Sequence, residues 1–142
     1  VLAEAPGGQP DVLLLATGSE VSLCLAAYEC LIAEGVQVRV VSMPCWELFE
    51  QQSPAYRDQV IPPHVTARIS VEEAATMGWD RYVGATGISI GMDTFGASAP
   101  LKELQRKFGF TPDRVMAAVR EQLLTDRLRE KPIHQTSAGG EV

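Results

Sequence analysis

Two adjacent carboxylates, Glu72 and Glu73, are the side chains of this sequence that most suggest acid–base chemistry. Two carboxyl groups can divide the roles of proton donor and acceptor when both flank one substrate. Adjacent residues do not face one another on a strand or a helix, however, so this spacing does not place both on one substrate. We expect either that one of them lies in a crevice at a strand end, or that the pair is solvated or close to the start of a helix.

The histidines and cysteines have no recognisable catalytic or metal-binding spacing. His64 follows two prolines and His134 lies in a polar segment near the end of the sequence, neither at a triad spacing from Ser, Cys or a carboxylate. The three cysteines lack the C-x-x-C spacing of a zinc site or a redox motif. Cys24 falls on an apolar helical stripe and is predicted to lie in the core, whereas Cys45, beside Trp46, is predicted to be the more exposed thiol.

A turn at Gly18-Ser19 separates a predicted strand from a predicted helix. Free backbone N–H groups at the start of a helix can hold an anion. The sequence nevertheless lacks the three glycines of a dinucleotide fingerprint and the Gly-Lys-Ser/Thr of a P-loop, and Glu20 in the first helical turn would repel a phosphate. We therefore interpret the turn as helix capping, with a small-ligand crevice as the alternative.

The segment 91–100 is the most unusual stretch, because Phe95 stands among glycine, alanine and serine residues ahead of Pro100. Small residues permit close approach of another backbone, and a single aromatic side chain can fill a pocket on a partner. Phe95 and Ser98 are therefore candidate interface residues. The alternative is an ordinary strand-to-helix loop in which Phe95 packs under its own domain.

Alternating strands and helices are predicted to position these residues. The apolar run 11–17 indicates a strand covered on both faces, and the helix that follows is expected to end at Gly35. Further strands are predicted over 36–42, 65–71 and 86–92. A short turn or helix is predicted around 46–49. Further helices are predicted over 53–60, over 100–109 and from Thr111 onward. This order predicts a three-layer, doubly wound α/β domain, with a mostly parallel sheet of about five strands and helices on both faces.

In such sheets ligands bind beyond the carboxyl ends of the strands, so that edge is where Gly18, Ser19, Glu72 and the loop with Phe95 and Ser98 are expected. By composition we divide the sequence into a linker (1–10), the α/β domain (11–125) and a polar, disordered tail (126–142).

The composition is that of one acidic domain. The sequence has 142 residues, with 12 Lys and Arg against 18 Asp and Glu, for a net charge of −6. A chain this acidic is a poor partner for a phosphate backbone, so we expect no nucleic-acid partner. No apolar run approaches the roughly 18 residues of a membrane span, so we also expect no membrane partner and a cytoplasmic location.

Ten short segments, in order from about Asp11 to Leu124, resemble the C-terminal domain of the transketolase family. They are 11–21, 33–36, 40–44, 55–57, 60–62, 66–68, 82–84, 90–92, 94–100 and 108–111. The Val-Ser-Met-Pro segment at 41–44 and the Phe-Gly-x-Ser-Ala-Pro segment at 95–100 resemble transketolase itself. They do so more than they resemble its relatives, 1-deoxyxylulose 5-phosphate synthase and the beta chains of 2-oxo acid dehydrogenases.

The resemblance implies a three-domain homodimeric enzyme that uses thiamine diphosphate and Mg²⁺. Such an enzyme moves a two-carbon ketol unit from a ketose phosphate to an aldose phosphate in pentose phosphate metabolism. In that family the first and middle domains hold the cofactor, and Glu72 and Glu73 do not correspond to the catalytic glutamate of the middle domain. We therefore expect this chain to be inactive alone, with no catalytic, cofactor-binding or metal-binding residue of its own.

The expected role is assembly and stability of the dimer, with residues 1–10 as the linker from an upstream domain. The partners would be the upstream domains of the same chain and the second subunit, while sugar phosphates would be bound by the parent enzyme. Two alternatives remain. One is a regulatory small-ligand module at the crevice by Gly18 and Glu72, and the other is the equivalent domain of 1-deoxyxylulose 5-phosphate synthase.

Overall fold

The fold was analysed in a computed structural model that describes residues 1–73, 76–91, 103 and 110–130. In that part of the chain four strands form one parallel sheet with the spatial order β2-β1-β3-β4. The elements in chain order are β1 (Val12–Ala16), α1 (Glu20–Ala33), β2 (Val38–Ser42), α2 (Trp46–Glu50), α3 (Pro54–Val60), β3 (Arg68–Glu72), α4 (Asp80–Val83), β4 (Ile88–Gly91) and α6 (Pro112–Glu130).

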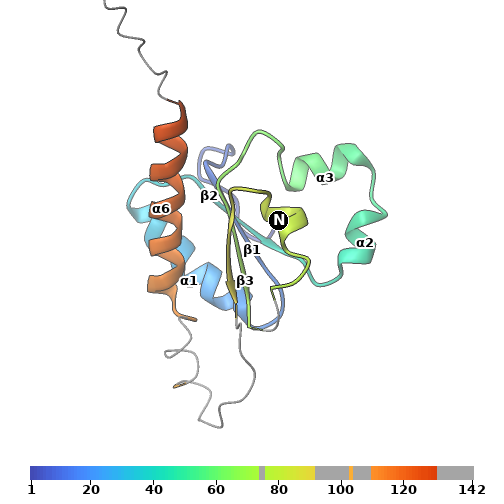
Figure 1. Ribbon diagram of the computed structural model, residues 1–142, viewed down its shortest axis with the longest axis horizontal. Coiled ribbons are helices and arrows are strands. Elements are labelled where there is room, and N and C mark those ends of the chain that lie inside the picture. The colour runs from blue at the N-terminus through green and yellow to red at the C-terminus, as the bar shows by residue number, and fades with distance from the viewer. Residues whose placement is uncertain (74–75, 92–102, 104–109, 131–142) are drawn as a thin grey trace, which may run out of the picture.

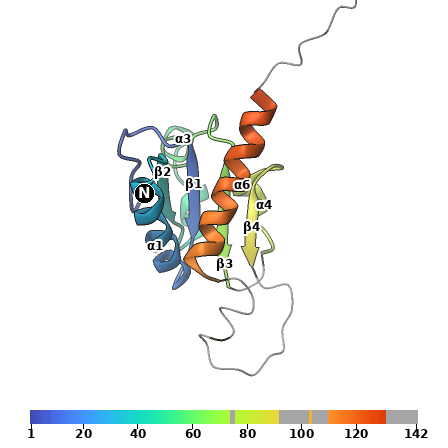
Figure 2. The same cartoon turned by 90° about the vertical axis from the view of Figure 1, so that its left-hand side faces the viewer.

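Helices cover both faces of the sheet, so the domain has three layers. Helices α1 and α6 lie side by side on one face, and α2, α3 and α4 lie on the other (Figures 1 and 2). The predicted doubly wound α/β architecture is confirmed, and the four described strands are close to the expected five.

The central strand β1 supplies both halves of the core, and all five of its residues are buried. Val12, Leu14 and Ala16 pack against α1 and α6, whereas Leu13 and Leu15 pack against the opposite layer. Successive side chains of a strand point to opposite faces, so a strand covered on both sides must be apolar at every position.

Local signals in the sequence mark the ends of three helices. Gly35 adopts a φ of 85°, which closes α1, and its N–H donates to the carbonyl of Ile32 at 3.0 Å. The Ser53 hydroxyl accepts from the Tyr56 N–H at 3.2 Å at the start of α3. The Thr111 hydroxyl does the same for the Arg114 N–H at 3.3 Å at the start of α6.

Two helices differ from expectation. The four-residue helix α4 was not predicted, because less than two turns gives no hydrophobic period. Helix α6 continues to Glu130, so the boundary expected between 125 and 126 falls inside it. Residues 125–130 include good helix formers, and the next proline is Pro132. The helix predicted over 100–109 lies outside the described residues except for Glu103.

The amino-terminal segment, expected to be a linker, runs along the outer edge of β2. Ala3 forms an antiparallel bridge with Val40, whose N–H donates to the carbonyl of Ala3 at 2.8 Å. The Leu2 N–H donates to the carbonyl of Val40 at 2.9 Å, and Ala5 is buried. The segment thereby covers an edge strand that would otherwise expose unpaired backbone groups. None of the helices described is both long and apolar enough to cross a bilayer.

Candidate functional site

Three of the five candidate residues lie at the carboxyl edge of the sheet. Gly18 and Ser19 form the turn after β1, and Glu72 is the last residue of β3. Strands β1 and β3 are paired with Ala16 opposite Val71, so the two strand ends are neighbours. The other two candidates, Phe95 and Ser98, lie outside the described residues.

The turn at Gly18-Ser19 is not the side-chain cap that the sequence suggested. Gly18 has a φ of 58°, and Ser19 occupies the N-cap position of α1 without a capping hydrogen bond from its hydroxyl. That hydroxyl instead donates to Oε1 of Glu20 at 3.1 Å. The Glu20 carboxyl group lies in the first turn of α1 with only 6% of the residue exposed, where the helix dipole favours negative charge.

A second carboxyl group meets Glu20 across this edge. Burial, a hydrogen bond with Glu20 and the charges of Glu20 and Glu72 raise the pKa of Glu73 above its ordinary value. The carboxyl groups that come together are therefore Glu20, in the first turn of α1, and Glu73, just after β3, rather than the adjacent pair 72–73 that the sequence suggested. Sequence reasoning treated Glu20 only as a residue that repels phosphate. The sequence does show an acidic residue just after each of two strands: Glu20 in the first turn of α1, after β1, and Glu73 after β3.

The arrangement is negatively charged and suits retention of a proton between two carboxyl groups. It does not suit a phosphate group, which the same charges would repel. Among the residues that the structure describes, no group of three or more His, Cys, Asp or Glu could hold a metal ion.

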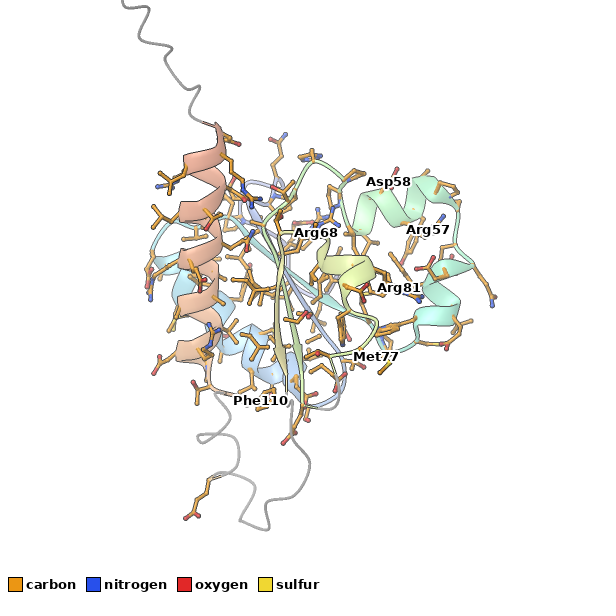
Figure 3. The ribbon with its side chains drawn as sticks, in the orientation of Figure 1. Arg57, Asp58, Arg68, Met77, Arg81 and Phe110 are labelled. Carbon is orange, nitrogen blue, oxygen red and sulfur yellow. The ribbon has the colours of Figure 1, made fainter. Side chains whose placement is uncertain are left out.

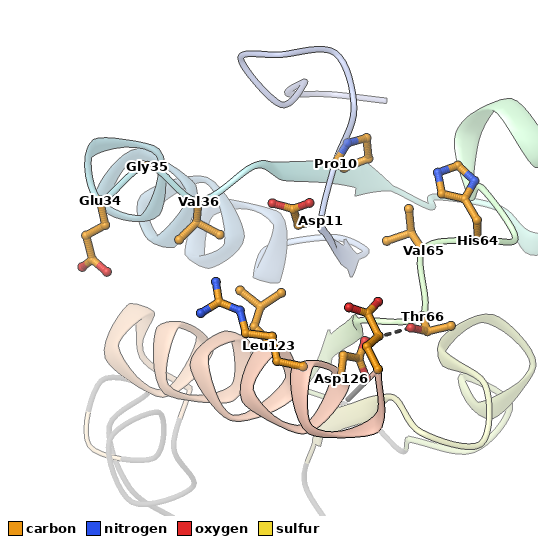
Figure 4. Close-up of a pocket in the computed structure, with 12 residues that line it drawn as sticks. Pro10, Asp11, Glu34, Gly35, Val36, His64, Val65, Thr66, Leu123 and Asp126 are labelled. Carbon is orange, nitrogen blue, oxygen red and sulfur yellow. Dashed lines mark hydrogen bonds between the residues drawn. The ribbon is translucent and has the colours of Figure 1, made fainter. Parts of the chain in front are cut away.

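The histidine and cysteine side chains lie elsewhere. His64 lines a cavity of about 410 Å³ at the opposite, amino-terminal edge of the sheet, together with Asp11 and Asp126 (Figure 4). In that cavity the Thr66 hydroxyl donates to Oδ2 of Asp126 at 2.8 Å. His134 lies outside the described residues.

The predictions for Cys24 and Cys45 are both confirmed. Cys24 is buried as predicted, and burial followed by the charge of Glu20 raises the pKa of its thiol to about 12. Cys45 is half-buried and therefore more exposed than Cys24, as predicted, whereas Cys30 on α1, for which the sequence analysis made no prediction, is exposed. The Cys45 Sγ lies 3.4 Å from Oε2 of Glu47. Cys30 precedes the buried Leu31 on α1 and therefore faces solvent. Cys45 is the N-cap residue of α2 and is partly covered.

A groove of about 330 Å³, lined by both apolar and polar side chains, lies on the α2 side of the domain. We call it the N-terminal groove and define it by Val1, Met43, Leu48, Phe49 and Tyr56, which line it. Leu48 is 60% exposed and Tyr56 is 46% exposed, although both are large side chains. Exposed apolar side chains that line one groove are typical of a surface that contacts another domain or subunit.

Comparison with known proteins identifies the family. A family model described as the transketolase-like TK C-terminal domain matches residues 1–111. The chain belongs to the transketolase C-terminal domain family. The transketolase of Geobacillus stearothermophilus is 52% identical over 116 residues, which cover 82% of this chain and 17% of that protein.

Solved transketolase structures share the fold. A transketolase from Leishmania mexicana superposes with a TM-score of 0.78 at 41% identity, covering 86% of this chain and 17% of that chain. A structure described as the inactive beta4 tetramer of a split gene transketolase has a TM-score of 0.60 at 27% identity, covering 80% of this chain and 39% of that chain. The chain thus spans less than a fifth of the first two of these transketolases.

The transketolase match also bears on the first ten residues and on the alternatives. The matched range includes residues 1–10, in agreement with their pairing to β2. Because these matches are to transketolases, the equivalent domain of 1-deoxyxylulose 5-phosphate synthase and a separate regulatory module are not favoured.

Proposed function

We propose that this chain works as the C-terminal domain of a transketolase and contributes to assembly and stability rather than to the chemical step. The parent enzyme would transfer a two-carbon ketol unit from a ketose phosphate to an aldose phosphate. Its upstream domains would hold thiamine diphosphate and Mg²⁺, and it would act as a cytoplasmic homodimer. The observation that carries the proposal is 52% identity over a segment that makes up 17% of a whole transketolase.

The N-terminal groove supports an assembly role. Val1, Leu48 and Tyr56 expose apolar surface beside one another. Burial of apolar surface stabilises a contact by about 25 cal/mol per Å², so a domain seated here would gain from covering these side chains. The exposed groove thus has the composition expected of an interdomain contact.

The split gene transketolase supports the non-catalytic part of the proposal. That protein is described as an inactive beta4 tetramer, and this chain matches 39% of it. A transketolase polypeptide that assembles without activity agrees with a division of labour in which assembly and chemistry belong to different parts of the enzyme.

The first test is an assay of the purified chain. Incubation with xylulose 5-phosphate, ribose 5-phosphate, thiamine diphosphate and Mg²⁺ is expected to yield no sedoheptulose 7-phosphate. The Geobacillus stearothermophilus enzyme, assayed in parallel, provides the positive control. Sedoheptulose 7-phosphate formed by the chain alone would contradict the proposal that the chemistry resides in other domains.

A further inference from the structure

Three arginines from three different elements line one cavity of about 250 Å³ on the α2, α3 and α4 side of the domain. Arg57 comes from α3, Arg68 is the first residue of β3, and Arg81 comes from α4 (Figure 3). The remaining lining residues are the apolar or aromatic Phe49, Pro54, Ile61 and Tyr82 and the acidic Glu50 and Asp58. Three positive and two negative side chains leave this cavity at 3 − 2 = +1 in a chain whose net charge is −6.

The charge of Glu50 is already engaged. Its Oε2 accepts from Nη1 of Arg57 at 2.9 Å, and its Oε1 accepts from the hydroxyl of Tyr82 at 2.8 Å. Burial and this contact with Glu50 raise the pKa of Tyr82. Asp58 is exposed to solvent. Within the described part of the chain, neither Arg68 nor Arg81 forms an ion pair, although the charge of Arg81 is close enough to Glu47 to act on its carboxyl group.

Arg68 is a cation held rigidly in place by neutral groups. Its Nε donates to the carbonyl of Val65 at 2.7 Å, Nη1 to that of Tyr82 at 2.9 Å, and Nη2 to that of Pro62 at 3.0 Å. The side chain is half-buried, and burial lowers its pKa. A fixed, half-desolvated guanidinium without a countercharge is preorganised for an anion, because little entropy remains to be lost when the anion binds.

The other two arginines each have one polar side-chain partner: Arg57 pairs with Glu50, and Arg81 forms a hydrogen bond with the side chain of Tyr82. The guanidinium carbon of Arg81 lies 5.9 Å from the ring centroid of Trp46 and 6.0 Å from that of Tyr82, which orients the group against aromatic faces. The Nε atom of Arg57 is buried without a hydrogen-bond partner among the described residues. A buried donor without a partner costs roughly 1–3 kcal/mol, and an oxygen of a bound anion would remove that cost.

We propose that this cavity binds a phosphate group, present either as the free ion or as part of a small phosphomonoester. A phosphate near pH 7 carries close to two negative charges and three acceptor oxygens, which suit a cavity lined by arginines from three elements. Phe49, Ile61 and Tyr82 would contact the organic part of an ester. The site lies away from the crevice by Gly18 and Glu72, where Glu20 and Glu73 would repel the same group.

The test is a titration of the whole chain by calorimetry at constant ionic strength, with glycerol 3-phosphate, inorganic phosphate and acetate as separate probes. We expect saturable binding of at least one phosphate probe and no binding of acetate. Comparison of glycerol 3-phosphate with inorganic phosphate then identifies whether the ester or the free ion is the tighter ligand. Amide chemical-shift changes are expected in α3 and α4.

Variants with matched charge locate the site. Arg81→Gln is expected to weaken phosphate binding at least about tenfold, equal to about 1.4 kcal/mol. Arg114→Gln makes the same charge change on the exposed first turn of α6, and we expect its affinity to stay within about twofold of the parent chain. Arg81→Lys keeps the charge but not the planar fork, and an intermediate affinity is expected. If Arg81→Gln changes the circular dichroism spectrum, Arg57→Gln takes its place with the same expectation.

The proposal is overturned by any of three results: phosphate probes that give flat titrations, acetate that binds as tightly as phosphate, or equal losses in Arg81→Gln and Arg114→Gln. Equal losses would mean that only the overall charge of the chain matters.

Discussion

Glu4 and Arg39 join the amino-terminal segment to the edge strand of the sheet through two parallel hydrogen bonds. Nε of Arg39 lies 2.9 Å from Oε1 of Glu4, and Nη2 lies 2.8 Å from Oε2. Nη1 of the same guanidinium donates to the carbonyls of Gln59 and Val60 at 2.7 and 3.1 Å. One buried cation therefore links the amino-terminal segment, β2 and the end of α3.

This ion pair predicts that Glu4→Gln lowers the free energy of unfolding by roughly 1–2 kcal/mol near pH 7, because Arg39 keeps a buried charge with a weaker partner. Burial raises the pKa of Glu4, but hydrogen bonds from Arg39 and the Ala5 N–H and the charge of Arg39 bring it below its ordinary 4.5 overall. A lowered folded-state pKa gives stability that is complete above pH 4.5 and is lost as the pH falls through the folded value. Urea unfolding should therefore show a difference near pH 7 that shrinks below pH 4.5.

The control for this pair is Glu34→Gln. Glu34 binds Arg120 at 2.7 Å, but 54% of the Arg120 side chain and 47% of the Glu34 side chain are exposed. We expect that change to cost less than about 0.5 kcal/mol. Equal losses in the two variants would contradict the anchoring role of Glu4.

Gly78 is expected to be far less tolerant of alanine than Gly84. Both have a positive φ, 90° and 74°, but a Cβ on Gly78 would lie 2.8 Å from the ring of Trp46, whereas no described residue lies within 4 Å of one on Gly84. Gly84 has a φ of 74° and a ψ of −176°, a conformation that essentially only glycine adopts, so Gly84→Ala should cost the backbone strain alone, about 1–3 kcal/mol. Gly78→Ala should cost at least about 1 kcal/mol more, because the Trp46 ring must shift from its contact with Trp79. Equal midpoints in urea unfolding followed by tryptophan fluorescence would contradict this packing.

Glu73→Gln is expected to stabilise the domain at neutral pH. Burial, the hydrogen bond with Glu20 and the nearby charges raise the pKa of Glu73 above 4.5. A carboxyl group with a raised folded-state pKa opposes folding once it ionises, so the penalty is present above that pKa and absent below 4.5. We expect a gain of about 0.5 kcal/mol near pH 7 that disappears near pH 4. A loss of stability near pH 7 would show instead that the fold needs the ionised carboxylate.

The three thiols should react in a definite order. Cys30 is exposed, Cys45 is half-buried, and Cys24 is buried with a pKa of about 12. Titration of the folded chain with 5,5′-dithiobis(2-nitrobenzoate) should therefore give a fast phase from Cys30 and a slower one from Cys45. Cys24 should react only after unfolding. Cys30→Ser should remove the fast phase, and a fast phase that survives this change would contradict the assignment.

Local signals in the sequence were sufficient for most elements. The apolar run at 11–17 indicates β1 because a strand buried on both faces must be apolar throughout, and the caps at Ser53 and Thr111 act over three residues. The amino-terminal segment shows the limit of this reasoning. Glycine and proline content indicates a linker, but pairing of Ala3 with Val40 is a backbone interaction that composition does not report.

The contacts that build both candidate sites depend on the order of strands in the sheet. Glu20 meets Glu73 because β3 lies beside β1, and Arg57, Arg68 and Arg81 line one cavity because α3 and α4 pack on the same face of the sheet that contains β3. Alternation of strands and helices predicts a parallel sheet but leaves this order open. The distant partners of charged residues therefore could not be named from the sequence.

The N-terminal groove leads to a prediction that separates folding from assembly. Leu48 is 60% exposed and Leu124, on α6, is 61% exposed, so substitution of either by Asp should change the stability of the isolated chain by less than about 0.5 kcal/mol. In a complete transketolase that carries this domain, Leu48→Asp should lower stability by at least about 2 kcal/mol, because the charge would be buried in a contact. Leu124→Asp is the matched control. Equal effects of Leu48→Asp in both proteins would contradict a contact at the groove.

The central claim is tested most directly by a domain exchange. In the Geobacillus stearothermophilus transketolase, the segment that matches this chain at 52% identity is replaced by the chain itself. The measurement is the formation of sedoheptulose 7-phosphate from xylulose 5-phosphate and ribose 5-phosphate with thiamine diphosphate and Mg²⁺. If this chain is a transketolase C-terminal domain that supports assembly, the hybrid folds, assembles and forms the product. A hybrid that folds and assembles but forms no product would contradict the account.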